Sequence, residues 1–228
     1  MIEPQSPPVP QLPTDGLPWR RWSVAAAGRQ WDIEAVSDQT ALLEVAEGFN
    51  AFPFGLLLWE SALALADALA SLRDGLAGTS VLEIGAGVGL AGLAASWLGA
   101  DVTQSDHLPA ALDVCRRNAG LNGLAPPRTL VGDWNDWRDD TKYDVVIGAD
   151  VLYERDVFAA VASILEGNVG PGGLAILADP GRPHTPEMVE LLEASGWSIA
   201  LQRRTLAALQ PNYAGQTIDV TIIAARRD

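Results

Sequence analysis

Two acidic side chains flank a glycine-rich stretch near the middle of the chain. Glu83 opens the run E-I-G-A-G-V-G, in which Gly85, Gly87 and Gly89 alternate with small apolar residues. Glycine lets the backbone turn tightly and lets a ligand approach without meeting a Cβ atom. Backbone amides exposed at the start of a following helix attract electron-rich groups. Asp106 follows at a second predicted strand end, where an acid hydrogen-bonds the ribose hydroxyls of a nucleotide.

These residues predict a site for a positively charged nucleoside. Gly87 to Gly92 also satisfies the G-x-G-x-x-G pattern of dinucleotide sites, which alone is a weak signal. However, Glu83 would repel a pyrophosphate, whereas it would attract an ammonium or sulfonium group. We therefore expect S-adenosylmethionine as the cofactor and keep a nicotinamide-dependent oxidoreductase as a remote alternative.

Short apolar strands and amphipathic helices alternate around these residues. Strands are expected at residues 81–84, 101–106, 129–133, 143–149 and 174–178. Helices are expected at residues 90–98, 108–119, 156–165 and 185–196, the last with Thr185 as its N-cap. Two final strands, at 197–202 and 217–224, lack a helix between them and suggest an antiparallel edge hairpin. This alternation of strands and helices predicts an α/β, three-layer, Rossmann-like fold with a mostly parallel seven-stranded sheet.

The first fifty residues differ in pattern from the rest. Residues 1–18 hold six of the fifteen prolines and predict an extended arm. Alternating apolar residues in 19–36 predict a β-hairpin, in which Trp19, Trp22 and Trp31 either pack or form a recognition surface. An apolar stripe from Leu58 to Leu76 predicts one helix. We expect a single domain over 19–228, with a hairpin extension at 19–50 and a catalytic core at 51–228.

Composition limits the partners and the compartment. Twenty-nine acidic and fifteen basic residues give a net charge of −14, which disfavours nucleic acid as a partner. The longest uncharged run, Ile84 to Ala100, is shorter than the ~18 residues that a membrane helix needs. Cys115 is the sole cysteine, and neither His107 nor His184 has the spacing of a metal ligand set. We therefore expect a cytoplasmic protein, a monomer, without a metal or a membrane association.

Four segments together resemble a known family. The run from Glu83 to Gly89 resembles the first motif of class I, seven-stranded S-adenosylmethionine-dependent methyltransferases. The segment G-A-D-V-L-Y, residues 148–153, resembles the signature of their protein-lysine branch, which includes the electron-transfer-flavoprotein β-subunit lysine methyltransferase and bacterial nicotinamide N-methyltransferase-like relatives. The resemblance implies that Asp133 and Trp134 hold adenine and that Trp59 and Ala149 contact the cofactor. Glu60 follows Trp59 where several relatives carry proline.

Asp150 and Tyr153 are the expected catalytic residues. A lysine amine has a pKa of roughly 10.4 and arrives charged at neutral pH, so the enzyme must hold an ammonium and let its proton leave. Asp150 is placed to receive that ammonium, and Tyr153 would add a ring face or a hydroxyl. Alternatively, Asp150 caps a helix and Tyr153 packs in the core. The polar segment 179–184 after the fifth strand is a further candidate lining of the acceptor site.

The sequence thus predicts an N-methyltransferase that acts on a lysine of a protein. An acidic surface suits a basic, lysine-bearing partner. A small-molecule N-methyltransferase acting on a nicotinamide-like amine is the alternative, and a closed pocket roofed by the N-terminal hairpin would favour it. A cofactor-binding module without catalysis remains if Asp150 and Tyr153 point away from the cofactor.

Overall fold

The computed structural model describes residues 14–37, 39, 40, 42, 43, 52–209 and 215–227. Most of the expected arm at 1–18 and the expected boundary at residue 50 lie outside these ranges. Within them, no helix is both long enough and apolar enough to cross a bilayer.

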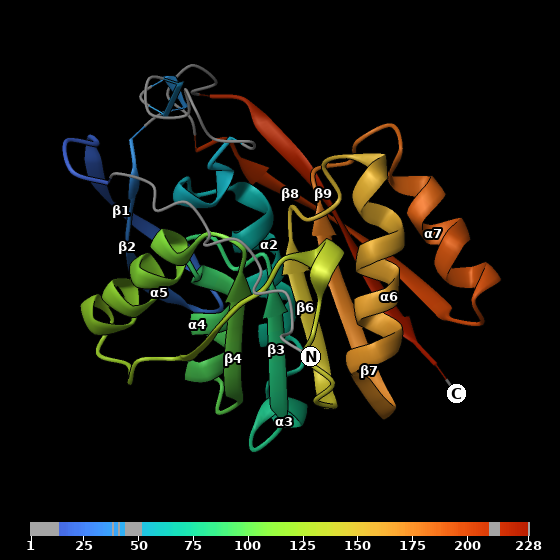
Figure 1. Ribbon diagram of the computed structural model, residues 1–228. Coiled ribbons are helices and arrows are strands. Elements are labelled where there is room, and N and C mark those ends of the chain that lie inside the picture. The colour runs from blue at the N-terminus through green and yellow to red at the C-terminus, as the bar shows by residue number, and fades with distance from the viewer. Residues whose placement is uncertain (1–13, 38, 41, 44–51, 210–214, 228) are drawn as a thin grey trace, which may run out of the picture.

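A seven-stranded sheet organises the described part of the chain (Figure 1). Its order is β5-β4-β3-β6-β7-β9-β8, and only β9 runs antiparallel to its neighbours β7 and β8. This confirms the predicted mostly parallel sheet with an antiparallel edge hairpin. The strands are β3 (Ser80–Ile84), β4 (Asp101–Asp106), β5 (Arg128–Val131), β6 (Tyr143–Ala149), β7 (Val169–Asp179), β8 (Ser198–Ala207) and β9 (Thr217–Arg226).

Helices cover both faces of the sheet. Val145 and Ile147 of β6 pack in the cluster that contains α2 and α4, whereas Val146 packs in the cluster that contains α6 and α7. Burial on both sides explains the unbroken apolar run of this central strand. The helices are α2 (Glu60–Ala70), α3 (Arg73–Leu76), α4 (Leu90–Trp97), α5 (Pro109–Leu121), α6 (Phe158–Asn168) and α7 (Thr185–Ala194), with short 3-10 turns η1 (Phe54–Leu56), η2 (Trp134–Asp136) and η3 (Arg155–Val157).

Two local predictions need correction. The stripe from Leu58 to Leu76 is not one helix, because α2 ends at Ala70 and α3 follows a turn. In that turn the Ser71 hydroxyl donates to the Asp67 carbonyl at 3.3 Å, a local bond that competes with the helix. Thr185 is the first residue of α7 rather than its N-cap, a position that His184 takes, and the Thr185 hydroxyl donates to the Asp179 carboxylate at 2.5 Å.

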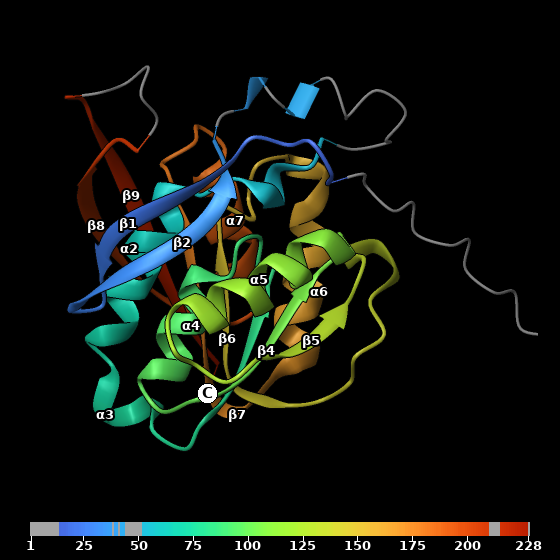
Figure 2. The same cartoon turned by 90° about the vertical axis from the view of Figure 1, so that its left-hand side faces the viewer.

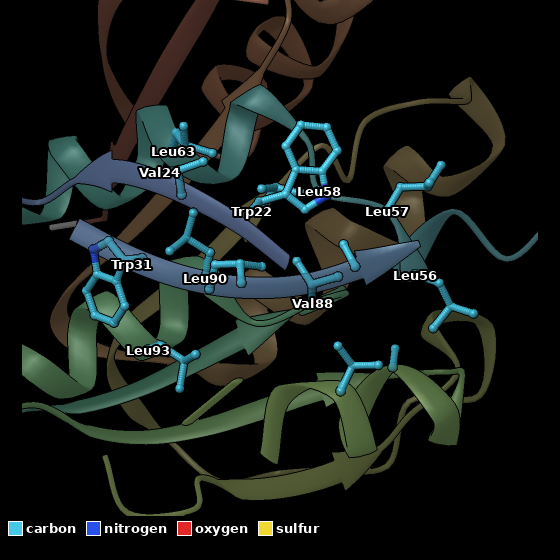
Figure 3. Close-up of a cluster of buried hydrophobic side chains, with 14 of the residues drawn as sticks. Trp22, Val24, Trp31, Leu56, Leu57, Leu58, Leu63, Val88, Leu90 and Leu93 are labelled. Carbon is cyan, nitrogen blue, oxygen red and sulfur yellow. The ribbon is translucent and has the colours of Figure 1, made fainter. Parts of the chain in front are cut away.

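The predicted N-terminal hairpin is confirmed and forms an additional layer. Strands β1 (Trp19–Ala26) and β2 (Arg29–Val36) pair antiparallel and lie over α2 and α5 (Figure 2). Trp22 and Trp31 are buried beside apolar side chains of α2 and α4 (Figure 3). These two tryptophans therefore pack the hairpin onto the core and do not form a recognition surface.

Two asparagines, one in α5 and one at its C-cap, satisfy the outer edge of strand β2. Asn118 accepts from the Glu34 amide at 2.8 Å and donates to the Glu34 carbonyl at 3.0 Å. Asn122 makes the same pair of bonds with the backbone of Asp32. A strand edge without such partners would leave its polar groups unpaired. Asn118 also donates to the Val88 carbonyl at 2.9 Å, so the hairpin is tied to the glycine-rich turn.

Candidate active site

The glycine-rich turn connects the carboxyl end of β3 to the first residue of α4. Gly85, Gly87 and Gly89 have φ angles of +61°, +55° and +87°, a region that residues with side chains rarely adopt. The turn thus presents bare backbone at the sheet edge where β3, β4 and β6 all end (Figure 1). Ligands of open α/β sheets bind at this edge.

The 3-10 turn η1 lies directly on the glycine-rich turn. A Cβ atom added to Gly87 would lie 3.1 Å from the Gly55 carbonyl oxygen, and one added to Gly55 would lie 3.4 Å from Asp106 Oδ2. Trp59 holds η1 in this position, because its indole N–H donates to the Phe54 carbonyl at 3.1 Å. The structure thus places Trp59 beside the predicted cofactor site, and its direct contact with a cofactor stays a prediction.

Asp106 ends β4 and fixes the glycine-rich turn. Its Oδ2 accepts from the Gly87 amide and its Oδ1 from the Leu108 amide, both at 2.9 Å. Burial raises the pKa of Asp106, while neighbouring His107 and these amides act in the opposite direction. A carboxylate has about four acceptor positions, so Asp106 keeps capacity for a ligand's hydroxyl groups.

Glu83 lies under helix α4, and this corrects its expected role. We expected its carboxylate to meet the cationic part of a ligand. Instead the side chain is buried, with Oε2 accepting from Gln104 Nε2 at 2.6 Å and a further hydrogen bond from the Gly92 amide. Burial raises its pKa to about 7. Glu83 therefore supports the glycine-rich turn from inside the protein, because its buried carboxylate is directed at Gln104 and at the first turn of α4.

The predicted adenine segment lies on the other side of the turn. Asp133 caps η2 by accepting from the Asn135 amide at 2.9 Å, and its side chain is exposed. The Trp134 ring packs so close to the turn that a Cβ atom on Gly85 would lie 2.9 Å from it. An aromatic ring and an acid thus flank the turn in the arrangement that the resemblance implies for adenine, while their contact with it stays a prediction.

Asp150 follows Ala149 directly at the carboxyl end of β6. Its φ of +59° is a left-handed conformation, held by a 2.8 Å hydrogen bond from its amide to the Ala178 carbonyl. Asp150 caps no helix, because α6 begins at Phe158, so the capping alternative is removed. Its carboxylate forms an ion pair with the guanidinium of Arg182. Burial raises the pKa of Asp150, whereas Arg182 lowers it.

Arg182 is the site residue that the sequence analysis missed within the segment 179–184. Its Nη1 also pairs with Asp179 Oδ2 at 2.8 Å. Asp179 is fully buried, and its Oδ1 accepts from two loop amides and from Thr185. The sequence indicated this loop as a candidate because it follows β7, and β7 lies next to β6 in the sheet. Which of its side chains turns toward Asp150 depends on the loop's backbone path.

Tyr153 belongs to a row of aromatic rings above the glycine-rich turn. Its ring centroid lies 6.2 Å from that of Phe54 and 6.2 Å from that of Trp134. The Tyr153 side chain is 36% exposed, which removes the alternative that it packs in the core. Burial of its inner part raises the pKa of the phenol, so it is neutral at physiological pH. We call these rings the aromatic rim; they are Phe52, Phe54, Trp59, Trp134 and Tyr153.

The assembled residues fit a sulfonium nucleoside. Bare backbone at Gly85 to Gly89, the Asp106 carboxylate and the Trp134 ring converge from three strand ends. Asp150 and Tyr153, the predicted acceptor residues, both follow the end of β6, and the Tyr153 ring meets the Trp134 ring. These are the features that would hold ribose, adenine and the atoms between them.

Comparison with known proteins identifies the family. Residues 37–181 match the family described as lysine methyltransferase. The chain belongs to this family. The predicted resemblance to S-adenosylmethionine-dependent methyltransferases of the protein-lysine branch is thus confirmed, and the oxidoreductase alternative is removed.

Relatives in this family carry names of protein methyltransferases. The chain is 39% identical over 115 residues to histone-arginine methyltransferase METTL23 of Rattus norvegicus, covering 47% of this chain and 51% of the relative. It is 35% identical over 130 residues to EEF1A lysine methyltransferase 3 of Mus musculus, covering 55% of each. The chain therefore spans about half the length of the curated relatives that it matches.

A solved structure shows the same fold. The 16S rRNA N2 G1207 methyltransferase RsmC of T. thermophilus, in complex with AdoMet and guanosine, superimposes with a TM-score of 0.63 at 20% identity. The superposition covers 97% of this chain and 52% of the other. At this identity the likeness concerns the fold, which agrees with the observed Rossmann-like sheet.

Proposed function

We propose that this member of the lysine methyltransferase family transfers a methyl group from S-adenosylmethionine to a lysine side chain of a protein. The observation that carries the proposal is the largely buried carboxylate of Asp150, which follows β6 and precedes Val151, a residue that lies against Gly85 of the glycine-rich turn. Asp150 already holds a cationic side chain, that of Arg182, so its surroundings suit an acceptor cation.

Each of these residues would have a separate role in the methyl transfer. When bound, the cofactor supplies an electrophilic methyl group on a sulfonium. Asp150 would hold the acceptor ammonium by a charge-assisted hydrogen bond and orient its nitrogen. The ammonium would pass its proton to water, and the freed lone pair would then form the N–C bond as the S–C bond breaks and S-adenosylhomocysteine leaves. The neutral ring of Tyr153 would offer its face to the same cation. The rings of Phe54 and Trp134 on either side of Tyr153 would exclude water from the reacting atoms.

An arginine acceptor is the second candidate. METTL23, the relative of 39% identity, is named as a histone-arginine methyltransferase. In this chain Asp150 binds a guanidinium, the group that such an acceptor would bring. A nicotinamide-like acceptor is less well supported, because Phe54 and Tyr153 are exposed and the hairpin packs on α2 and α5 rather than forming a roof over them.

We further propose that the protein works as a cytoplasmic monomer on a basic protein partner, without nucleic acid or a membrane as a partner. The net charge of −14 supports a basic partner. A buried, unpaired Cys115 agrees with a reducing compartment.

The test is Asp150→Asn with labelled S-adenosylmethionine and matched protein acceptors rich in lysine or in arginine. We expect kcat/KM to fall about a hundredfold or more, since the acceptor loses its counter-charge. Mass spectrometry of the product names the modified side chain. In the wild type, activity should fall as pH drops through the raised pKa of Asp150, because the protonated acid no longer attracts a cation.

The matched control is Asp156→Asn, an exposed acid in the turn η3. Its activity should equal that of the wild type. Calorimetry with S-adenosylhomocysteine should give both variants the wild-type affinity. Full transfer by Asp150→Asn would contradict the assigned role.

A further inference from the structure

Four charged side chains from separate elements gather behind the acceptor position. Glu60 comes from α2, Asp150 follows β6, and Asp179 ends β7. Arg182 lies in the loop after β7 and pairs with both aspartates. Glu60 and Asp179 both contribute to the electrostatic environment of Asp150. Arg182 thus pairs with two carboxylates, and the carboxylate of Glu60 acts on Asp150 at longer range, which leaves an excess of negative charge for a further cation.

Two of these carboxylates have other hydrogen-bond donors. Glu60 Oε1 accepts from the Leu209 amide at 2.6 Å. Asp179 accepts from the Gly181 and Arg182 amides, both at 2.9 Å, and from the Thr185 hydroxyl. The carboxylate of Asp150 has Arg182 as its ion-pair partner within the described residues. Asp150 is therefore the carboxylate with the most to gain from a second cation.

The two ion pairs of Arg182 differ in how far solvent reaches them. Asp179 is fully buried, whereas the side chains of Asp150 and Arg182 are 12% and 26% exposed. A cation that enters from solvent can therefore compete for Asp150, while Arg182 keeps its pair with Asp179. A buried carboxylate left without a counter-charge is costly, so Asp150 would release Arg182 only to another cation.

We propose that Arg182 is a specificity-determining positioning residue, which occupies Asp150 until a cationic group of the acceptor takes its place. This rests on the proposed function in that Asp150 is the acceptor carboxylate. An ammonium or a guanidinium restores the charge balance of Asp150, and a neutral amine such as a pyridine does not. Arg182 thereby selects lysine-like or arginine-like side chains against uncharged acceptors.

Side-chain NMR of the protein bound to S-adenosylhomocysteine tests the exchange without methyl transfer. The protein is labelled with ¹⁵N-arginine, and the Nε–H signal of Arg182 is assigned as the signal that is absent from the spectrum of Arg182→Gln. Titration with n-butylammonium or with methylguanidinium should move this signal, and nicotinamide, a neutral pyridine, should not. Arg182→Gln should bind the two cations about tenfold more tightly than the wild type, because a charged competitor is removed. Arg182→Lys keeps the charge and should bind close to the wild type.

Arg155→Gln is the matched control, since Arg155 makes an exposed ion pair with Glu187 nearby. It should bind the cations as the wild type does, and Asp150→Asn should not bind them. In turnover, Arg182→Gln should lower KM for the acceptor with little change in kcat, whereas a general loss of structure would lower kcat and the melting temperature.

Equal or weaker cation binding by Arg182→Gln would overturn the proposal, as would an unmoved Arg182 signal in a wild type that binds the cation. If Arg182→Gln does not fold, the signal shift in the wild type and the affinity of Arg182→Lys decide the question. Absence of methyl transfer to every protein tested would count against the proposed function alone, because the exchange at Asp150 is measured without transfer.

Discussion

The carboxyl groups of Glu83 and Asp106 show how neighbouring acids acquire different tasks. Both are buried, and in both burial raises the pKa. Asp106 accepts from amides of the turn and of the segment leading into α5, next to Gly55 of η1. Glu83 accepts from Gln104 and Gly92 inside the protein. Position relative to α4, rather than charge, separates the acid that is predicted to bind ribose from the acid that supports the turn.

The raised pKa of Glu83 makes the free energy of unfolding depend on pH. Its pKa is about 7 in the folded chain and about 4.5 when exposed. The folded state binds the proton of Glu83 more tightly than the unfolded state does. The resulting contribution to the free energy of unfolding is fully present below pH 4.5 and is lost as pH rises through 7. Glu83→Gln should therefore gain stability relative to the wild type between pH 5 and 8.5, by on the order of 3 kcal/mol.

Urea unfolding of both proteins over that pH range measures the difference. Other titrating groups are common to both proteins and cancel. A constant difference between wild type and variant would show that Glu83 stays ionised when folded.

At the scale of elements, the glycine-rich turn is a junction of five segments. Gly87 meets η1, Gly85 meets the Trp134 ring, and Gly89 lies against Cys115 of α5. Gly92, in the first turn of α4, lies against Glu83 and Gln104. The glycine spacing that resembles a phosphate-binding pattern therefore also serves close packing. At Gly92 packing is the whole reason, because its neighbours are buried side chains.

Gly92→Ala tests this packing. The added Cβ would lie 2.3 Å from Glu83 Oε2 and 2.5 Å from Gln104 Nε2. We expect a loss of about 1–3 kcal/mol of stability, as for overpacking, and weaker binding of S-adenosylhomocysteine. Thermal unfolding and calorimetry measure the two effects.

Gly120→Ala on α5 is the matched control. It has nothing within 4 Å of its added Cβ and should gain about 0.5–1 kcal/mol, as an alanine does in a helix. A stabilised Gly92→Ala would contradict the packing argument.

For the whole molecule, charge and layering are the relevant properties. The hairpin layer is joined to the core by Asn118, which bridges β2 and the glycine-rich turn. The turn is thus held from three sides, by α5, by η1 and by β4. Around this rigid centre the chain carries a net charge of −14. A field of that sign attracts basic proteins over a distance set by the salt concentration.

Association with a basic protein acceptor should weaken as salt increases. Between 50 and 300 mM NaCl we expect kcat/KM for such an acceptor to fall about tenfold, mainly through slower association. Steady-state kinetics over that range provide the measurement. Affinity for S-adenosylhomocysteine should change much less, because it binds through short contacts. A kcat/KM that is independent of salt would show that the charge does not guide the acceptor.

The sequence by itself determined the elements and the motifs. Apolar periodicity is a local property of the chain. The alternation of strands and helices, the edge hairpin and the N-terminal hairpin could therefore all be predicted. The glycine-rich turn, Asp106 and Asp150 were placed at strand ends because each follows an apolar run in the chain.

Only tertiary structure decided which way side chains turn. It put Glu83 under α4, joined Phe54, Trp134 and Tyr153 into one rim, and set Arg182 on Asp150. Such contacts join residues 19 to 99 positions apart, and their geometry depends on packing that no local pattern encodes.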